Sequence, residues 1–134
     1  MNLTVEPLRE GNSHPKETVE VTRQDITKYA GAAGDYSKIH VDEKFATEAG
    51  YDSVIAMGML TAGIAGSITN AWLGLENVRA FDVRFVGIVY PGDVLTYVAE
   101  IEEETGGELK GTVTATKSSG ETVLTGSVRA HRPE

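Results

Sequence analysis

The sequence predicts an α+β fold in which an antiparallel sheet wraps around one long, buried helix. Two patterns lead to this prediction: a run of sixteen residues without charge, and a second half of alternating polar and apolar residues broken by turn signals. The chain has 134 residues, which suits one hydrophobic core and leaves no room for two. Residues 1–134 are therefore expected to form a single domain.

The helix is expected over residues 58–73, with the sequence GMLTAGIAGSITNAWL. Because this stretch has no charged side chain, we expect it to be buried nearly all round. It is also rich in small residues, three of them glycine, and such a composition would be poor for an isolated helix. Small residues instead suit a helix that a sheet encloses closely.

The strands follow this helix. Phe81, Val83 and Phe85 alternate with polar neighbours, and the same period of two recurs three more times. Turn sequences separate the runs, including Pro91-Gly92-Asp93 and Gly106-Gly107. Because such turns link adjacent strands, the sheet should be antiparallel. The four strands are expected near residues 81–85, 95–101, 109–115 and 124–128.

The first third of the chain predicts shorter elements. Thr22 is a good helix N-cap, and Asp25 stands where a carboxylate meets free backbone N–H groups. Apolar residues then recur at helical spacing until Gly34. In order, we expect an irregular lead-in over residues 1–16, a strand over 17–21, a helix from Thr22 to Gly34, a loop, and a short helix from Asp42 to Gly50.

Composition narrows the possible functions. The chain has no cysteine, which rules out disulfides, thiolate metal ligands and a cysteine nucleophile, and its three histidines are scattered, so no metal site and no cofactor are expected. A net charge of −8 disfavours nucleic acid and anionic membranes as partners. No secretory signal or membrane-spanning run is evident, so a cytoplasmic location is expected.

Asp35 and His40 are the candidate acid–base pair. They lie in the loop between two predicted helices, and loops on a rigid scaffold often carry catalytic side chains. A carboxylate accepts hydrogen bonds while an imidazole can both donate and accept, so the two together could hold a water molecule and move its protons. Spacing alone also allows a helix-capping Asp35 and a His40 bonded only to backbone.

Gly58 gives this pair a possible partner. The apolar segment Val54-Ile55-Ala56-Met57 leads to Gly58 at the predicted start of the buried helix. Backbone N–H groups at a helix N-terminus carry partial positive charge, and they could stabilise a developing oxyanion. Close packing of the helix start is the alternative role for the glycine.

These elements together resemble the MaoC-like dehydratases, a family of R-specific enoyl-CoA hydratases and acyl thioester dehydratases. The resemblance rests on three motifs in order, and it covers residues 22–128. The motifs are Gly34-Asp35 through His40 to Asp42 and Phe45-Ala46, then Ile55-Ala56-x-Gly58-Met59-Leu60, then Arg84-Phe85 leading to Val89-Tyr90-Pro91-Gly92-Asp93.

The resemblance implies a hot-dog fold, usually a dimer or larger homo-oligomer, that adds water reversibly to a 2-enoyl thioester. Asp35 and His40 would activate the water, and the Gly58 amide would hold the thioester oxygen. The substrate would be linked to coenzyme A or an acyl carrier protein. The residues expected to contact it are Tyr36, Ile39, Met57, Met59 and Arg84. Arg84 and Lys38 are the candidate cations for the coenzyme A phosphates, and a solvated charge on a strand face or loop is the alternative role for each.

Two departures from the family pattern affect the substrate pocket. Met57 stands where many members have a histidine, and Gly66 stands near the place of a serine found in many hydratases. A hot-dog thioesterase and a non-catalytic acyl-binding subunit of a heterodimer are the alternative functions. The histidine partner favours the hydratase over the thioesterase, because it suits proton delivery to carbon, and the intact Asp35–His40 pair disfavours the non-catalytic subunit.

Overall fold

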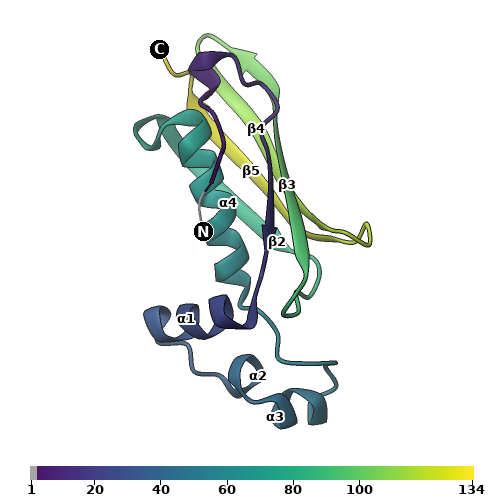
Figure 1. The fold of residues 1–134 in the computed structure, drawn as a ribbon. Helices are drawn as coiled ribbons and strands as arrows, with labels where there is room; N and C mark the ends of the chain where they lie inside the picture. The colour runs from purple at the N-terminus through teal and green to yellow at the C-terminus, as the bar shows by residue number, and fades with distance from the viewer. Residues whose placement is uncertain (1–2) are drawn as a thin grey trace.

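A computed structural model describes residues 3–134 and shows one antiparallel sheet curved around a long helix (Figure 1). Residues 1 and 2 of the expected lead-in lie outside the described part. The helices are α1 (Arg23–Ala33), α2 (Lys38–Val41), α3 (Glu43–Glu48) and α4 (Gly58–Leu73), with 3-10 turns at Leu8–Glu10 and Leu75–Asn77. The strands are β1 (Lys16–Glu20), β2 (Val78–Phe85), β3 (Val94–Thr105), β4 (Glu108–Lys117) and β5 (Thr122–His131).

The five strands run in the order β1-β3-β4-β5-β2, and each neighbouring pair is antiparallel. Hairpins join β3 to β4 and β4 to β5, as the glycine-rich turns predict. Within residues 3–134, β2 pairs only with β5 and β1 only with β3, so these two strands form the sheet edges. The hot-dog arrangement of an antiparallel sheet around a long helix is confirmed.

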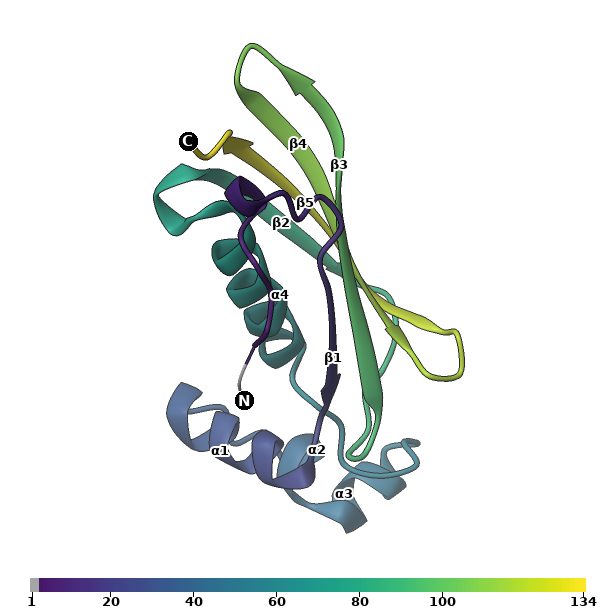
Figure 2. The same ribbon diagram turned by 45° about the horizontal axis from the view of Figure 1, so that its top comes forward.

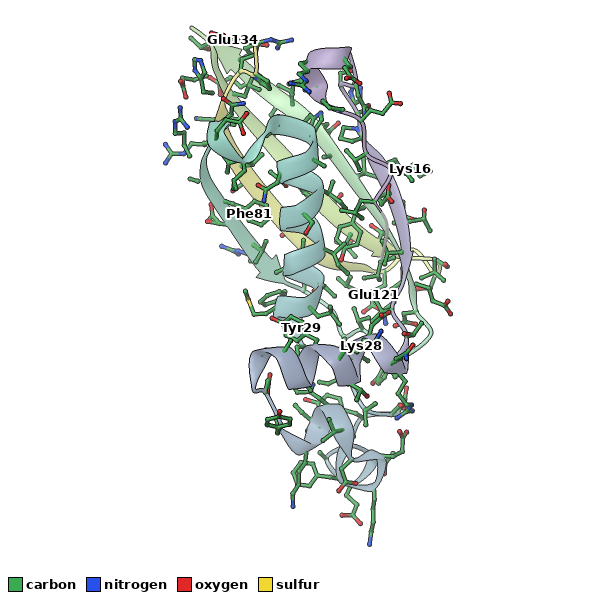
Figure 3. The ribbon with its side chains drawn as sticks, turned by 60° about the vertical axis from the view of Figure 1, so that its left-hand side comes forward. Lys16, Lys28, Tyr29, Phe81, Glu121 and Glu134 are labelled. Carbon is green, nitrogen blue, oxygen red and sulfur yellow. The ribbon has the colours of Figure 1, made fainter. Side chains whose placement is uncertain are left out.

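The sheet packs its apolar face against α4. Leu95, Tyr97 and Ala99 of β3 are fully buried there, and their polar neighbours along the strand lie on the outer face. On the helix, Ile64, Ile68 and other residues at positions three and four apart face the sheet. Figure 3 shows Phe81 of β2 beside α4, where its ring lies 3.9 Å from the place a Cβ on Gly66 would occupy.

The expectation that α4 is buried nearly all round is wrong for the single chain. Met59, Gly63 and Ser67 lie along one exposed stripe of the helix, which continues to Asn70. The sheet curves around only the opposite side, because its β2 edge ends beside the helix (Figure 1). The absence of charge therefore reflects two different environments, a core-facing side and an uncovered side.

The helix start at Thr22 follows the predicted capping pattern. The Thr22 hydroxyl accepts a hydrogen bond from the Asp25 amide at 3.0 Å, and the Asp25 carboxylate accepts one from the Thr22 amide at 2.9 Å. Gly34 ends α1 with a φ of 69°. The short helix after Asp42 is confirmed as α3, but the one-turn helix α2 replaces what was expected to be a loop.

The segment before β1 is mostly irregular, but it contributes to the core. Leu8 is buried, and the Trp72 indole donates a hydrogen bond to the Asn12 carbonyl at 2.7 Å. These contacts hold the segment against the C-terminal half of α4, whereas α1, α2 and α3 gather at its other end (Figure 2). No helix in the described part of the chain is both long and apolar enough to cross a membrane.

Candidate active site

The Asp35 side chain is placed by the chain's exit from α1. The Asp35 amide bonds to the Ala30 carbonyl at 3.0 Å, which closes the last turn of the helix around Gly34. One carboxylate oxygen then accepts a hydrogen bond from the Ser37 amide at 3.3 Å, a turn typical of aspartate. The side chain remains 43% exposed, so its second oxygen is open to other partners.

His40 lies in α2 and is almost completely buried. Its Nδ1 is 2.7 Å from the carbonyl oxygen of Ile55. Because a carbonyl only accepts hydrogen bonds, Nδ1 must carry the proton of this bond, and Nε2 of the neutral ring then bears a lone pair. That Nε2 lies 3.7 Å from Oδ2 of Asp35. The structure therefore brings the two predicted residues together, with two proton-accepting atoms facing each other.

The segment that leads to Gly58 is fixed from two sides. Its Ile55 amide donates to the Ile39 carbonyl of α2 at 3.0 Å, and its Ala56 amide donates to the Val89 carbonyl at 2.8 Å. Together with the hydrogen bond between His40 and Ile55, these contacts join α2 to the start of α4. A shift of this segment would move both the histidine and the helix N-terminus.

Gly58 is the first residue of α4, and Met57 caps the helix without a side-chain hydrogen bond. The first amides of a helix have no partner within it, so they can bind an anion or oxyanion. A Cβ on Gly58 would lie 3.0 Å from the Phe85 ring. The glycine therefore allows Phe85 to cover the helix start at close range.

A small apolar cavity adjoins this helix start. It has a volume of about 190 Å³ and is lined by residues 55–58, Thr61, Phe85 and residues 87–89. The buried Met57 forms part of its wall. This is the position at which the family pattern has a histidine in many members. An apolar cavity next to unpaired helix amides can take a hydrocarbon group whose carbonyl oxygen meets those amides.

The remaining sequence-predicted residues are more dispersed. Ile39 is partly buried and bonds to the Ile55 segment through its carbonyl, whereas Tyr36 next to Asp35 is 67% exposed. Met59 is 59% exposed on the uncovered side of α4. Arg84 lies on the outer face of β2, because Phe85 beside it faces the helix. The single chain therefore does not bring Arg84 to the Asp35–His40 pair.

Two contributors were not predicted. The Ile55 carbonyl sets the tautomer of His40, and the Phe85 ring closes over Gly58. A backbone carbonyl leaves no signal in residue type, and Phe85 was expected only as a strand residue within the Arg84-Phe85 motif. Within residues 3–134 no group of three or more histidine, aspartate or glutamate side chains is placed to hold a metal ion.

Comparison with known proteins places this chain in a family. The family model described as "MaoC like domain" matches residues 8–123. A 3-hydroxyacyl-thioester dehydratase X of Mycobacterium tuberculosis is 32% identical over 87 residues, which cover 64% of this chain and 30% of the relative. A peroxisomal hydratase-dehydrogenase-epimerase of Neurospora crassa is 36% identical over 83 residues, covering 60% of this chain and 9% of that protein.

A solved structure shares the fold. The R-hydratase PhaJ1 of Pseudomonas aeruginosa superposes with a TM-score of 0.83 over 98% of this chain and 83% of that one, at 21% identity. The chain spans less than a third of the length of the curated relatives it matches. Since the family model covers most of the sequence, the chain belongs to the MaoC-like dehydratase family.

Proposed function

We propose that this chain is an R-specific 2-enoyl thioester hydratase, which also runs in reverse as a 3-hydroxyacyl thioester dehydratase. One observation carries the proposal. The His40 ring is fixed by the Ile55 carbonyl so that its Nε2 faces the Asp35 carboxylate at 3.7 Å, and Ile55 lies three residues before Gly58, the first residue of α4. The names of the hydratase and dehydratase relatives support the same chemistry.

The pair is suited to hold the water molecule that reacts. Nε2 of a neutral His40 and the ionised Asp35 carboxylate are both acceptors, and a water molecule between them can donate one proton to each. As the water oxygen bonds to C3 of the enoyl group, the pair takes one of its protons. A proton from the pair then bonds to C2 on the same face, so that the added atoms are those of one water molecule. The acid and base roles are shared, because two coupled groups titrate as a unit.

The helix start would stabilise the intermediate charge. Attack at C3 moves an electron pair through C2 to the thioester oxygen, which becomes an enolate oxygen before C2 is protonated. The Gly58 amide would donate to this oxygen, with the positive end of the α4 dipole behind it. We assign the apolar cavity beside it, with Met57 in its wall, to the acyl chain.

The thiol carrier of the substrate would be coenzyme A or an acyl carrier protein. Both carriers are negatively charged, and the chain also has a net charge of −8. A local cation is therefore needed to offset the repulsion. Lys38 is exposed on the same short helix as His40, with its ammonium group 5.7 Å from the centre of the Phe45 ring. We propose Lys38 as the nearer cation and Arg84 as one that could serve from the outer face.

A second copy of the chain would cover the open side of α4. That side joins the unpaired edge of β2, where Phe85 and Val86 are each about half exposed, and Met59 adds a third large apolar side chain. Exposed apolar patches and unpaired sheet edges are common sites of protein association. A homodimer, or a larger homo-oligomer, is therefore proposed, and light scattering of the purified protein measures it.

The test is hydration of crotonyl-CoA and longer 2-enoyl-CoA substrates, followed as loss of absorbance of the conjugated thioester. Asp35→Asn and His40→Ala should each lower kcat at least about 100-fold, because each removes a group that moves a proton. His14→Ala is the matched control, since His14 is exposed and its ring is hydrogen-bonded to the neighbouring Ser13 side chain. Circular dichroism establishes that all variants are folded.

Three results would refute the proposal. Wild-type rates in both Asp35→Asn and His40→Ala would rule out these two residues as the catalytic pair. Release of free coenzyme A without a hydroxyacyl product would identify a thioesterase instead. No turnover at any chain length, with acyl-CoA binding intact, would identify a non-catalytic subunit. Chiral analysis of the hydroxyacyl product tests the R assignment separately.

A further inference from the structure

Lys117, the last residue of β4, carries a nearly buried positive charge. Its side chain is only 12% exposed, and its ammonium group lies 3.0 Å from Asp93 and 3.4 Å from Glu121. The same group lies 5.4 Å from the centre of the Tyr90 ring. Burial alone would lower the pKa of Lys117, but the bonds to Asp93 and then Glu121 outweigh it and raise the pKa. Lys117 is therefore a charged donor enclosed by three side chains.

Two of those side chains belong to the turn before β3. The Asp93 carboxylate accepts a hydrogen bond from the Tyr90 amide at 2.8 Å, and the Asp93 amide donates to the Tyr90 carbonyl at 3.0 Å. Gly92 completes the turn with a φ of 91°, which favours glycine. The Lys117 ammonium and the Tyr90 amide thus share the same Asp93 oxygen, so the lysine fixes both ends of the turn.

This turn holds the loop of the candidate active site at two points. The Asp52 amide donates to the Tyr90 hydroxyl at 3.3 Å, and the Ala56 amide donates to the Val89 carbonyl at 2.8 Å. Between these two points lies Ile55, whose carbonyl orients His40. A continuous set of direct contacts therefore runs from Lys117 through the turn to the histidine and to the start of α4.

We propose that Lys117 is a positioning residue for the candidate active site. Through Asp93 and Tyr90 it fixes residues 89–93, which in turn fix residues 52–56 and the hydrogen bond that orients His40. Lys117 itself would contact neither the substrate nor the Asp35–His40 pair. Its kinetic consequences rest on the proposed hydratase function, whereas its effect on the His40 ring does not.

The ammonium group of Lys117 contributes a directional contact and not only packing volume. A methionine has similar length and could occupy the same space without the desolvation of an ammonium group. It could not donate to Asp93, however, so the turn would lose the contact that fixes its carboxylate. Lys110 on the same strand shows the contrast, because its ion pair with Glu103 is 3.7 Å long and both side chains are about 60% exposed.

The experiment compares Lys117→Met with Lys117→Arg and with the control Lys110→Met. Lys117→Met should lower kcat for crotonyl-CoA by about 10- to 100-fold with KM changed less than about threefold, since misplaced catalytic groups affect the chemical step. Lys117→Arg keeps the charge and should recover most of the activity. Lys110→Met should match the wild type.

Nitrogen-15 NMR of the histidine rings provides a readout independent of activity. In the wild type His40 should show the tautomer protonated at Nδ1, with its signals assigned by their loss in His40→Ala. Lys117→Met should shift these signals toward a mixture of tautomers, because the Ile55 carbonyl is no longer held against Nδ1. Lys117→Arg and Lys110→Met should leave them unchanged.

Wild-type kcat together with wild-type His40 signals in Lys117→Met would overturn the inference, even if the variant were less stable, and would leave Lys117 a purely structural residue. If Lys117→Met does not fold, Asp93→Asn weakens the same contact with little change of shape, and unchanged His40 signals there would overturn the inference equally. If the wild type shows no hydratase activity, the proposed function fails, and the NMR comparison alone decides the role of Lys117.

Discussion

Replacing Tyr97 with phenylalanine removes one hydroxyl from the core beneath α4. Tyr97 lies on β3 with no exposed surface, and its hydroxyl donates a hydrogen bond to the Thr61 carbonyl at 3.0 Å. The Thr61 hydroxyl in turn donates to the Gly58 carbonyl at 2.8 Å. Burial raises the pKa of Tyr97 far above its ordinary value. The variant therefore tests both a buried hydrogen bond and a buried ionisable group.

At high pH, the loss of the hydrogen bond and the loss of the ionisable group change the stability of Tyr97→Phe relative to the wild type in opposite directions. At pH 7.5 the lost hydrogen bond should lower the free energy of unfolding by about 1 kcal/mol. Because the folded pKa lies above the unfolded value of about 10, the stabilising contribution of the neutral phenol is complete below pH 10 and is lost as pH rises above it. At pH 10.5 this loss amounts to about 1 kcal/mol in the wild type and is absent in Tyr97→Phe. The difference between the two proteins should therefore nearly vanish.

Urea unfolding at pH 7.5 and pH 10.5, followed by circular dichroism, measures both differences. Tyr36→Phe is the matched control, since this hydroxyl is on an exposed ring, and its unfolding free energy at pH 7.5 should stay within about 0.5 kcal/mol of the wild type. A gap between wild type and Tyr97→Phe that is the same at both pH values would refute the assignment of a buried, neutral phenol. A loss above about 3 kcal/mol at pH 7.5 would show that the hydroxyl does more than make one neutral bond.

Three further substitutions test the local structure, each by urea unfolding. Thr22→Ala should cost about 1 kcal/mol, because the amide of Asp25 loses its cap, and no loss would contradict the capping box. Gly111→Ala should cost about 2–4 kcal/mol, since the new Cβ would lie 2.8 Å from the Glu100 carbonyl oxygen, and wild-type stability would show that the strands can separate there. Gly63→Ala meets open space in one chain and should stabilise a monomer by up to about 1 kcal/mol. If a partner covers α4 as proposed, the same change should weaken the dimer in light scattering, and a stabilised, unaltered dimer would place the interface elsewhere.

Much of the fold was predictable because its signals are local or periodic. The capping residues Thr22 and Asp25 start α1 as expected, and α4 spans the predicted residues 58–73. Each strand expected after α4 was found, although β2 begins earlier, at Val78. Helix α2 was missed because one turn has too few residues for a periodic pattern, and its contacts with Ile55 come from a distant part of the chain.

The sequence by itself identified Asp35, His40 and Gly58 as residue types suited to proton transfer and oxyanion binding, and it predicted the helix that presents Gly58. Their mutual arrangement depended on the tertiary structure. The ring of His40 is oriented by the Ile55 carbonyl, fifteen residues away. The loop that contains Ile55 is fixed by the turn at Tyr90 and, through that turn, by Lys117. Residue types and their spacing encode helices, strands and turns, whereas hydrogen bonds between distant backbone groups form only once the sheet has brought those segments together.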